Sequence, residues 1–235
     1  MLQLYIANKN YSSWSMRPWV LMKQAGIPFE EIMVRFGANT FAAGSAFKQG
    51  VQTVSPAGRV PVLVDDGFPV WDTLAIAEYL AEKFPDKQLW PADSRDRARA
   101  RSLCAEMHSG FNALRSACPM NIEASLPVAG ALAWRDKPDV RADVQRLVEM
   151  WTELLQGNTG GPGAQAGLLF GGFSIADAYF APVCMRLKTY ALPVPALIEA
   201  YMQRVFALPG VKAWTDEALM EKDFVEFDEP YRVSR

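Results

Sequence analysis

The sequence predicts an α/β domain followed by an all-helical domain. In the first part of the chain, short apolar runs typical of strands alternate with segments of helical spacing. A proline-flanked stretch then interrupts this alternation, and after it the periodic segments have helical spacing. The chain has 235 residues, of which 50% are hydrophobic and 21% charged, which is enough apolar material for one large domain or two small ones.

The first domain is predicted to begin with a βαβ unit. Residues 2–7 form an apolar strand, a loop follows at residues 12–15, and residues 16–25 have the pattern of a helix. Gly26 ends this helix, and residues 29–34 form a second strand. Because a helix joins the two strands, we expect them to be parallel.

A β-hairpin and a further helix complete the first domain. Residues 36–57 mix glycines and serines with short apolar pieces, which indicates irregular structure with a helical turn. Strands are predicted at residues 60–64 and 68–71 around an Asp-Gly turn, and a helix at residues 73–84. The resulting order, β-α-β followed by β-β-α, is that of a thioredoxin-like domain.

A proline-flanked linker at residues 85–93 separates the two predicted domains, residues 1–84 and 94–235. The second domain is predicted to be all-α, with helices at residues 94–117, 138–155, 175–190 and 196–207, and a last helix that follows Pro209-Gly210 and extends to about residue 220. A glycine-rich run at residues 157–163 lacks the preceding strand and the Lys-Ser/Thr ending of a phosphate-binding loop.

Composition and charge argue against several classes of function. The net charge is −2 and no domain is basic, so no nucleic-acid partner is expected. No apolar run reaches membrane-spanning length, and the N-terminus lacks a signal-peptide pattern. Cys104, Cys118 and Cys184 do not have the number or spacing of a disulfide framework or zinc site, and His108 is the only histidine. We therefore expect a cytoplasmic protein with no metal and no membrane partner.

The stretch from Gly58 to Ile76 predicts a ligand site. Pro61 removes one donor at the start of a strand, which leaves the backbone of Val60 free to pair with something other than the sheet. A helix then begins at Asp72-Thr73, and its N-terminus offers unpaired N–H groups and the positive end of a dipole. A free backbone edge beside an anion site suits a small, extended, peptide-like ligand with a carboxylate.

Four motifs, in order and covering nearly the whole chain, resemble those of the cytosolic glutathione transferases. Residues 12–17 (Ser-Ser-Trp-Ser-Met-Arg) resemble the serine-type active-site loop of the zeta class, and residues 59–63 the strand that bears the family's cis-proline. Residues 72–76 resemble the glutathione motif, and residues 174–177 the capping box of the helical domain. The resemblance implies a glutathione transferase fold, glutathione as cosubstrate, a homodimer and a role in detoxification.

The resemblance also implies that a serine hydroxyl donates a hydrogen bond to the glutathione thiolate. Ser12 is the first candidate and Ser13 the second, while Ser15 is expected to cap the helix. A thiolate stabilised in this way is a nucleophile at neutral pH. Serine cannot carry out thiol–disulfide exchange, so an intrinsic reductase is not expected.

The glutathione contacts follow from the same resemblance. The backbone of Val60, before a cis Pro61, is expected to pair with the cysteinyl part of glutathione. Asp72 and Thr73 are expected to hold its γ-glutamyl end at the helix N-terminus. The glycyl carboxylate is assigned to Lys48 or Gln49, and to Arg59.

A pocket for the second substrate is expected between the domains. Its candidate residues are Trp14, Met107, His108, Phe111 and Arg115, although core packing is an alternative role for the apolar ones. The zeta class has cysteine where this chain has Trp14, so this large side chain is expected to reshape the pocket. The zeta class also has Trp-Arg-Val-Arg where this chain has Met-Arg-Pro-Trp at residues 16–19, and the two departures together weaken the expectation of maleylacetoacetate isomerase activity.

The predicted function is a glutathione transferase that activates the glutathione thiolate for attack on small apolar electrophiles. One alternative is a glutathione-dependent isomerase or dehalogenase that uses the same thiolate. Another is a non-catalytic binding module with the transferase fold. The combination of Ser12, Pro61 and Asp72-Thr73 favours an enzyme.

Overall fold

The computed structural model describes residues 1–37, 39–157 and 167–235. Its mixed sheet has the order β2-β1-β3-β4 and consists of β1 (Leu2–Ile6), β2 (Glu30–Met33), β3 (Val62–Asp65) and β4 (Phe68–Trp71). β1 pairs with β2 in parallel and with β3 antiparallel, and β3 pairs with β4 antiparallel. Two parallel strands beside an antiparallel hairpin confirm the predicted thioredoxin-like pairing.

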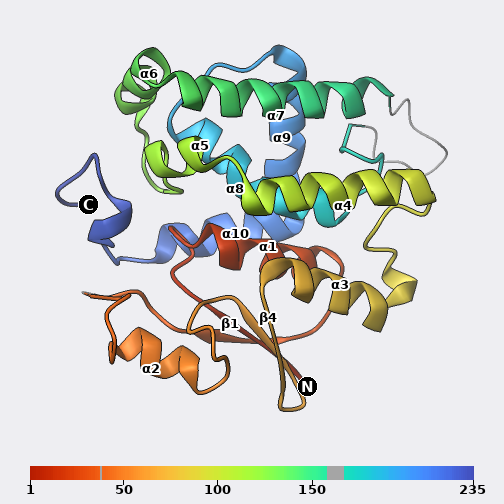
Figure 1. Cartoon of the computed structure of the whole chain (residues 1–235), viewed down its shortest axis with the longest axis vertical. Coiled ribbons are helices and arrows are strands. Elements are labelled where there is room, and N and C mark those ends of the chain that lie inside the picture. The colour runs from red at the N-terminus through yellow and green to blue at the C-terminus, as the bar shows by residue number, and fades with distance from the viewer. Residues whose placement is uncertain (38, 158–166) are drawn as a thin grey trace.

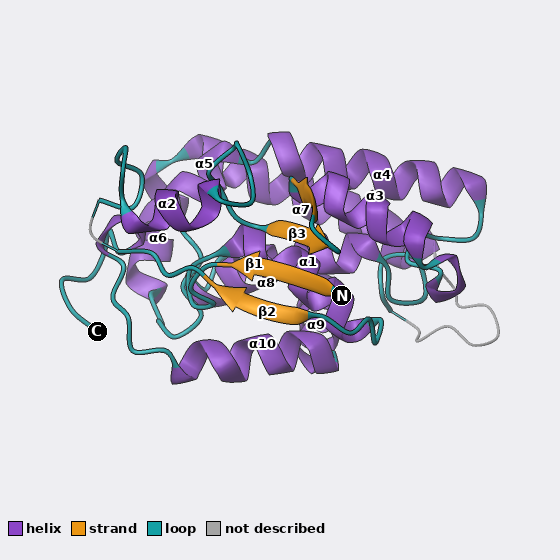
Figure 2. Ribbon diagram, turned by 90° about the horizontal axis from the view of Figure 1, so that it is seen from below, coloured by secondary structure: helices purple, strands orange, loops and turns teal. Residues whose placement is uncertain are grey.

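Helices cover both faces of this sheet (Figures 1 and 2). α1 (Ser13–Gln24) and α3 (Thr73–Lys83) lie between the sheet and the helices of the second half, and α1 contacts α8 and α10 there. α2 (Ala46–Gln52) packs on the opposite face, where Phe47 and Val51 join a small core with residues of β3. The N-terminal ends of α1 and α3 therefore both lie at the junction of the two halves.

Two expectations for the first domain were wrong in detail. α1 begins at Ser13, inside the predicted loop, because the side chain of Ser12 caps the helix. Residues 36–57 contain a seven-residue helix, α2, whose N-cap Ser45 accepts a hydrogen bond from the backbone of Lys48 at 3.1 Å.

The second half of the chain is helical, as predicted (Figure 1). Its described residues form α4 (Ser94–Ser109), α5 (Asn112–Ala117), α6 (Pro127–Asp136), α7 (Pro138–Gly157), α8 (Ile175–Thr189), α9 (Ala196–Ala207) and α10 (Pro209–Met220). A 3₁₀ turn, η1 (Pro85–Lys87), precedes α4, and another, η2 (Glu226–Asp228), follows α10. No helix in the described part of the chain has both the length and the apolar composition needed to cross a membrane.

The long helix predicted over residues 94–117 is in fact two helices. Gly110 is extended and ends α4, and Phe111 has a positive φ of 57°, so the chain turns before α5 begins. α6 was not predicted, because its sequence of small residues has little periodicity. The glycine-rich run predicted at residues 157–163 lies, beyond Gly157, outside the described residues.

α8 runs through the core of the second half, and the capping box expected at its start is formed. The buried Asp177 carboxylate accepts from the backbone N–H of Ser174 at 3.0 Å and of Leu169 at 3.2 Å. It also accepts from the Tyr201 hydroxyl at 3.2 Å. Burial raises the pKa of Asp177 to about 6, against the effect of these hydrogen bonds.

The C-terminal segment after α10 folds back against the loop that precedes α1 (Figure 1). The Glu221 carboxylate accepts from the backbone N–H groups of Lys9 at 2.8 Å and Asn10 at 3.2 Å. The Tyr11 hydroxyl donates to Glu229 at 2.7 Å. Two carboxylates from the end of the chain thus hold the loop that leads into α1.

Candidate active site

Ser12 lies at the N-terminal end of α1 with its hydroxyl in a short chain of hydrogen bonds. Its Oγ accepts from the backbone N–H of Ser15 at 3.3 Å and donates to Ser15 Oγ at 2.7 Å. Ser15 Oγ also accepts from the backbone N–H of Ala7 at 3.1 Å. The helix cap is therefore Ser12 and not Ser15 as predicted, and Ser15 instead links the cap to the end of β1.

The second part of the site is the turn into β3 and the start of α3. The Val60–Pro61 peptide bond is cis, as predicted. Asp72 has a positive φ of 76° and caps α3 by accepting from the backbone N–H of Leu74 at 2.9 Å. Thr73 is buried, and its hydroxyl accepts from the Tyr179 hydroxyl of α8 at 2.7 Å.

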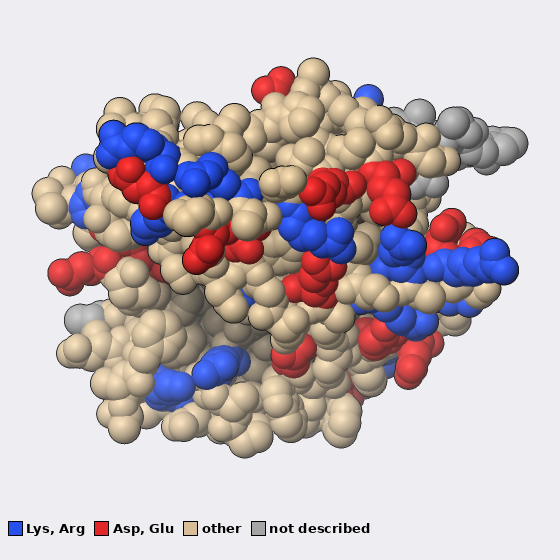
Figure 3. Space-filling model, turned by 45° about the horizontal axis from the view of Figure 1, so that its top comes forward, with Lys and Arg blue, Asp and Glu red and all other residues tan. Residues whose placement is uncertain are grey.

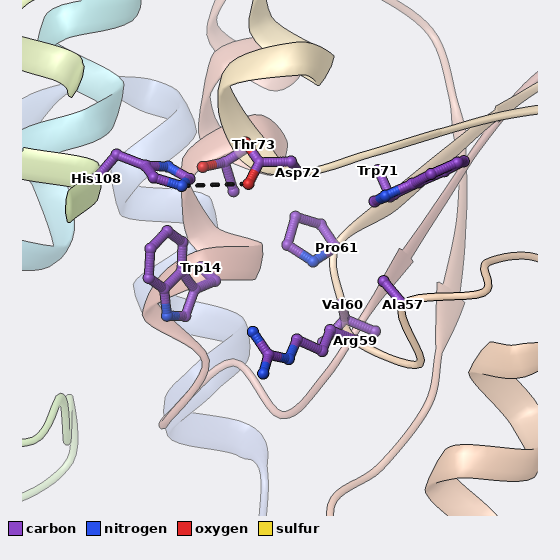
Figure 4. A pocket seen from close by; sticks show the side chains of 9 residues that line it. All are labelled: Trp14, Ala57, Arg59, Val60, Pro61, Trp71, Asp72, Thr73 and His108. Carbon is purple, nitrogen blue, oxygen red and sulfur yellow. Dashed lines mark ion pairs between the residues drawn. The ribbon is translucent and has the colours of Figure 1, made fainter.

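Two adjoining cavities lie along these elements. The smaller one, of about 260 Å³, has nine lining residues, which Figure 4 shows: Trp14, Ala57, Arg59, Val60, Pro61, Trp71, Asp72, Thr73 and His108. The larger one, of about 600 Å³, is lined by Ser12, Ser13, residues of α2 and residues of the second half. Trp14, Arg59 and Val60 border both. Figure 3 shows the surface hollowed between the two halves of the molecule, with basic side chains beside the hollow.

Trp14 stands between the two cavities and is surrounded by positive charge. The Arg17 guanidinium lies 4.2 Å from the centre of its ring system, and that of Arg115 lies 4.8 Å away. His108 packs edge-on against the same ring at 5.1 Å. These contacts hold the large side chain where it borders both cavities, and Figure 4 shows it in the smaller one, below His108.

Two buried arginines lie beside Trp14 and Ser13. Arg17 donates weakly to the Thr73 hydroxyl at 3.5 Å, and Arg186 of α8 donates to Ser13 Oγ at 3.1 Å. Burial lowers the pKa of each guanidinium to about 10, and both remain charged at neutral pH. Neither forms an ion pair with a carboxylate of the described residues, so their charge adds to the positive N-terminal end of α1.

The structure brings together most of the residues that the sequence singled out. Ser12, Ser13, Lys48 and Arg115 line the larger cavity, and Lys48 also donates to the carbonyl of Gly58 at 3.0 Å. Asp72, Thr73, Pro61 and His108 line the smaller cavity, whereas Trp14, Arg59 and Val60 border both. Met107 and Phe111 lie buried in the core and border neither cavity.

Sequence reasoning missed several residues of the larger cavity: Phe36, Phe41, Phe47, Met120, Arg186, Phe227 and Asp228. One signal was available, since Arg186 is a charged residue among the apolar positions of the helix predicted at residues 175–190. For the C-terminal segment, which has no periodic pattern, the sequence offered none.

Comparisons with known proteins agree with this arrangement. Residues 11–83 match the glutathione S-transferase N-terminal domain, and residues 98–217 match the glutathione S-transferase C-terminal domain. Glutathione S-transferase GstA of Escherichia coli O157:H7 is 31% identical over 168 residues, which are 68% of this chain and 73% of that protein. The chain therefore belongs to the glutathione S-transferase family.

Other relatives confirm the zeta-like resemblance. Glutathione S-transferase Z1 of Arabidopsis thaliana is 26% identical over 82% of this chain and 85% of that protein. Maleylacetoacetate isomerase of Rattus norvegicus is 32% identical over 48% of this chain and 50% of that protein. A solved glutathione transferase homologue from Burkholderia, with bound glutathione, has 26% identity and a TM-score of 0.66 and covers 92% of this chain and 97% of that one.

Proposed function

We propose that the protein is a glutathione transferase that activates the thiol of bound glutathione for attack on an electrophile. The observation that carries this proposal is the meeting of three groups at two adjoining cavities: the Ser12 hydroxyl, Val60 before the cis Pro61, and the Asp72-capped start of α3. Family membership supports the same activity.

In this proposal glutathione lies across both cavities. Its γ-glutamyl carboxylate binds at the N-terminus of α3, where Thr73 begins the helix, and its ammonium group binds the Asp72 carboxylate. The cysteinyl backbone pairs with Val60, so the sulfur points toward Ser12. Lys48 and Arg59 are assigned to the glycyl carboxylate, since both border the larger cavity and Arg59 forms no ion pair within the described residues.

The hydrogen bonds at Ser12 suit stabilisation of a thiolate. When Ser12 Oγ accepts from the Ser15 N–H, its own proton is free to be turned from Ser15 Oγ toward a sulfur atom in the cavity. The dipole of α1 and the buried charges of Arg17 and Arg186 act in the same direction. Lowering the thiol pKa by about two units stabilises the thiolate by roughly 2.7 kcal/mol relative to the thiol.

A glutathione-dependent isomerase is the second candidate. The observation that favours it is the similarity to the maleylacetoacetate isomerase of Rattus norvegicus, which covers about half of each chain. In an isomerase the thiolate adds to an activated double bond and is later expelled, whereas in a transferase the conjugate is released. Detection of a stable glutathione conjugate by mass spectrometry distinguishes the two.

The test of the main proposal has two stages. Retention on immobilised glutathione, with elution by free glutathione, measures binding. Turnover of glutathione with 1-chloro-2,4-dinitrobenzene then measures conjugation. Retention without turnover of any electrophile supports a non-catalytic binding module, and absence of both contradicts the proposal.

We further propose a cytoplasmic homodimer with a role in detoxification, built from domains 1–84 and 94–235 joined by residues 85–93. Phe68 and Trp71 of β4 are 62% and 42% exposed and form part of the surface assigned to the partner subunit. Trp90 of the linker, in contrast, is buried within its own chain, so it does not support the dimer.

A further inference from the structure

The larger cavity has one wall of aromatic side chains. The ring centres of Phe36 and Phe47 are 5.2 Å apart, those of Phe36 and Phe227 are 5.4 Å apart, and those of Phe41 and Phe227 are 5.0 Å apart. Phe41 and Phe227 are 63% and 46% exposed, so their faces are open to the cavity and to solvent. This wall suits a planar aromatic group.

Four basic side chains also border the larger cavity. Arg115 and Arg186 line it from the second half, and Lys48 and Arg59 border the same cavity from the first half. In the described part of the chain none of these four cations forms an ion pair with a carboxylate. In our proposal glutathione brings one carboxylate, the glycyl one, to this cavity, where Lys48 and Arg59 bind it. The positive charges of Arg115 and Arg186 then remain without a carboxylate partner.

The acidic side chain that borders this cavity is Asp228, from the C-terminal segment. It feels the positive charge of Arg186 but is not within ion-pair distance of it, and burial raises the pKa of its carboxyl to about 6. Arg186 itself is only 7% exposed and donates to Ser13 and to the backbone carbonyl of Cys118. The two residues thus place opposite charges in one cavity without neutralising each other directly.

We infer that the second substrate is an aromatic electrophile that carries a carboxylate. Its ring lies against the phenylalanine wall, its carboxylate binds toward Arg115 and Arg186, and Asp228 limits the affinity for this anion. The inference rests on the proposed function and specifies its substrate class. For an aryl chloride, the thiolate sulfur forms a bond to the ring carbon, the carbon–chlorine bond breaks, and chloride leaves with the electron pair.

The first test compares 4-chloro-3,5-dinitrobenzoate with the corresponding benzamide, a matched pair that differs in charge. Each rate with glutathione is divided by the uncatalysed rate at the same pH, because the two rings differ in reactivity. We expect kcat/KM, corrected in this way, to favour the benzoate by about tenfold, a size typical of one partly screened charge interaction. Equal corrected values for the two substrates overturn the inference and leave the proposed function intact.

Variants assign this preference to the cavity. Asp228→Asn is expected to raise the benzoate-to-benzamide ratio by about three- to tenfold, and Arg115→Met to lower it by a similar factor. Glu226→Gln is the matched control, because Glu226 is an exposed acid in the same 3₁₀ turn that does not border this cavity. If Glu226→Gln changes the ratio as much as Asp228→Asn, the effect is long-range and the assignment to Asp228 is wrong.

The second test measures binding without chemistry. Calorimetric titration of the protein with 3,5-dinitrobenzoate and with 3,5-dinitrobenzamide, at saturating glutathione, is expected to show tighter binding of the benzoate and a further gain in Asp228→Asn. This result supports the anion site even if neither aryl chloride is turned over. Absence of turnover then contradicts the proposed transferase activity and not the anion site. Equal binding of the two probes, or binding of neither, overturns the inference.

Discussion

The imidazole of His108 and the carboxylate of Asp72 join the two halves of the molecule across the smaller cavity, with Nε2 and Oδ2 3.2 Å apart (Figure 4). His108 lies near the end of α4, and Asp72 caps α3. Burial lowers the pKa of His108, and the nearby charges of Arg17 and Arg115 act in the same direction, although Asp72 opposes them. A neutral imidazole that donates from Nε2 therefore orients the carboxylate that we assign to the glutathione ammonium group.

Asp72→Asn is expected to raise the KM for glutathione by about tenfold with a smaller change in kcat, because it weakens binding in the ground state. Steady-state kinetics with varied glutathione check this. The asparagine retains an oxygen that can cap α3, so the unfolding midpoint serves as the control for a purely structural effect. An unchanged KM means that Asp72 is a helix cap only.

Ser12→Ala is expected to lower kcat by about 10- to 1000-fold, the usual effect of removing one hydrogen-bond donor from a developing or bound anion. The absorbance of the bound thiolate near neutral pH, measured by ultraviolet difference spectroscopy, is expected to disappear with it. Ser13→Ala is the matched comparison, since Ser13 borders the same cavity but accepts from Arg186. If Ser13→Ala has the larger effect, the role belongs to Ser13.

Glu221→Ala is expected to destabilise the protein by about 1–3 kcal/mol, because it leaves the N–H groups of Lys9 and Asn10 without their acceptor. Since these residues lead into Ser12, we also expect a lower kcat. Denaturant unfolding and steady-state kinetics measure the two effects, and Lys222→Ala, at the exposed neighbouring position, is the control. Equal stability of the two variants rules out this role for the C-terminal segment.

The buried Asp177 is expected to make stability depend on pH. Its pKa rises from 3.8 in the unfolded chain to about 6 in the folded protein, so the folded state binds the proton more tightly. The contribution of Asp177 to the free energy of unfolding is therefore fully present below pH 4 and is lost as pH rises through about 6. The loss amounts to about 3 kcal/mol. The free energy of unfolding of wild type relative to Asp177→Asn, measured between pH 4 and 7, should fall by this amount. A difference that stays constant over this range contradicts the raised pKa.

The protein is expected to be a two-fold homodimer at micromolar concentration, as determined by light scattering. Trp71→Arg, on the exposed part of β4, is expected to shift the mass toward that of one chain, and Val128→Arg, on the exposed surface of α6, is not. A monomeric mass for wild type removes the proposal.

The sequence by itself determined the fold and the parts of the site that depend on near neighbours in the chain. Three of these parts each depend on only a few consecutive residues: the cap at Ser12, the strand with the cis-proline, and the start of α3. A short sequence motif is therefore enough to predict each of them. The exact cap was still misassigned between Ser12 and Ser15, because both hydroxyls can accept from helix N–H groups and only the backbone path decides between them.

Tertiary structure alone decided the character of the larger cavity. Phe36 and Phe227 touch although they are far apart in the sequence, and Arg186 reaches Ser13 from a distant helix. Such contacts depend on how the C-terminal segment and α8 pack against α1. Periodicity in the sequence shows which face of an element is buried, but it does not show which distant segment that face contacts. The sequence therefore identified the serine loop to which we assign thiolate stabilisation, whereas the charge and shape of the cavity that we assign to the second substrate emerged only from the folded molecule.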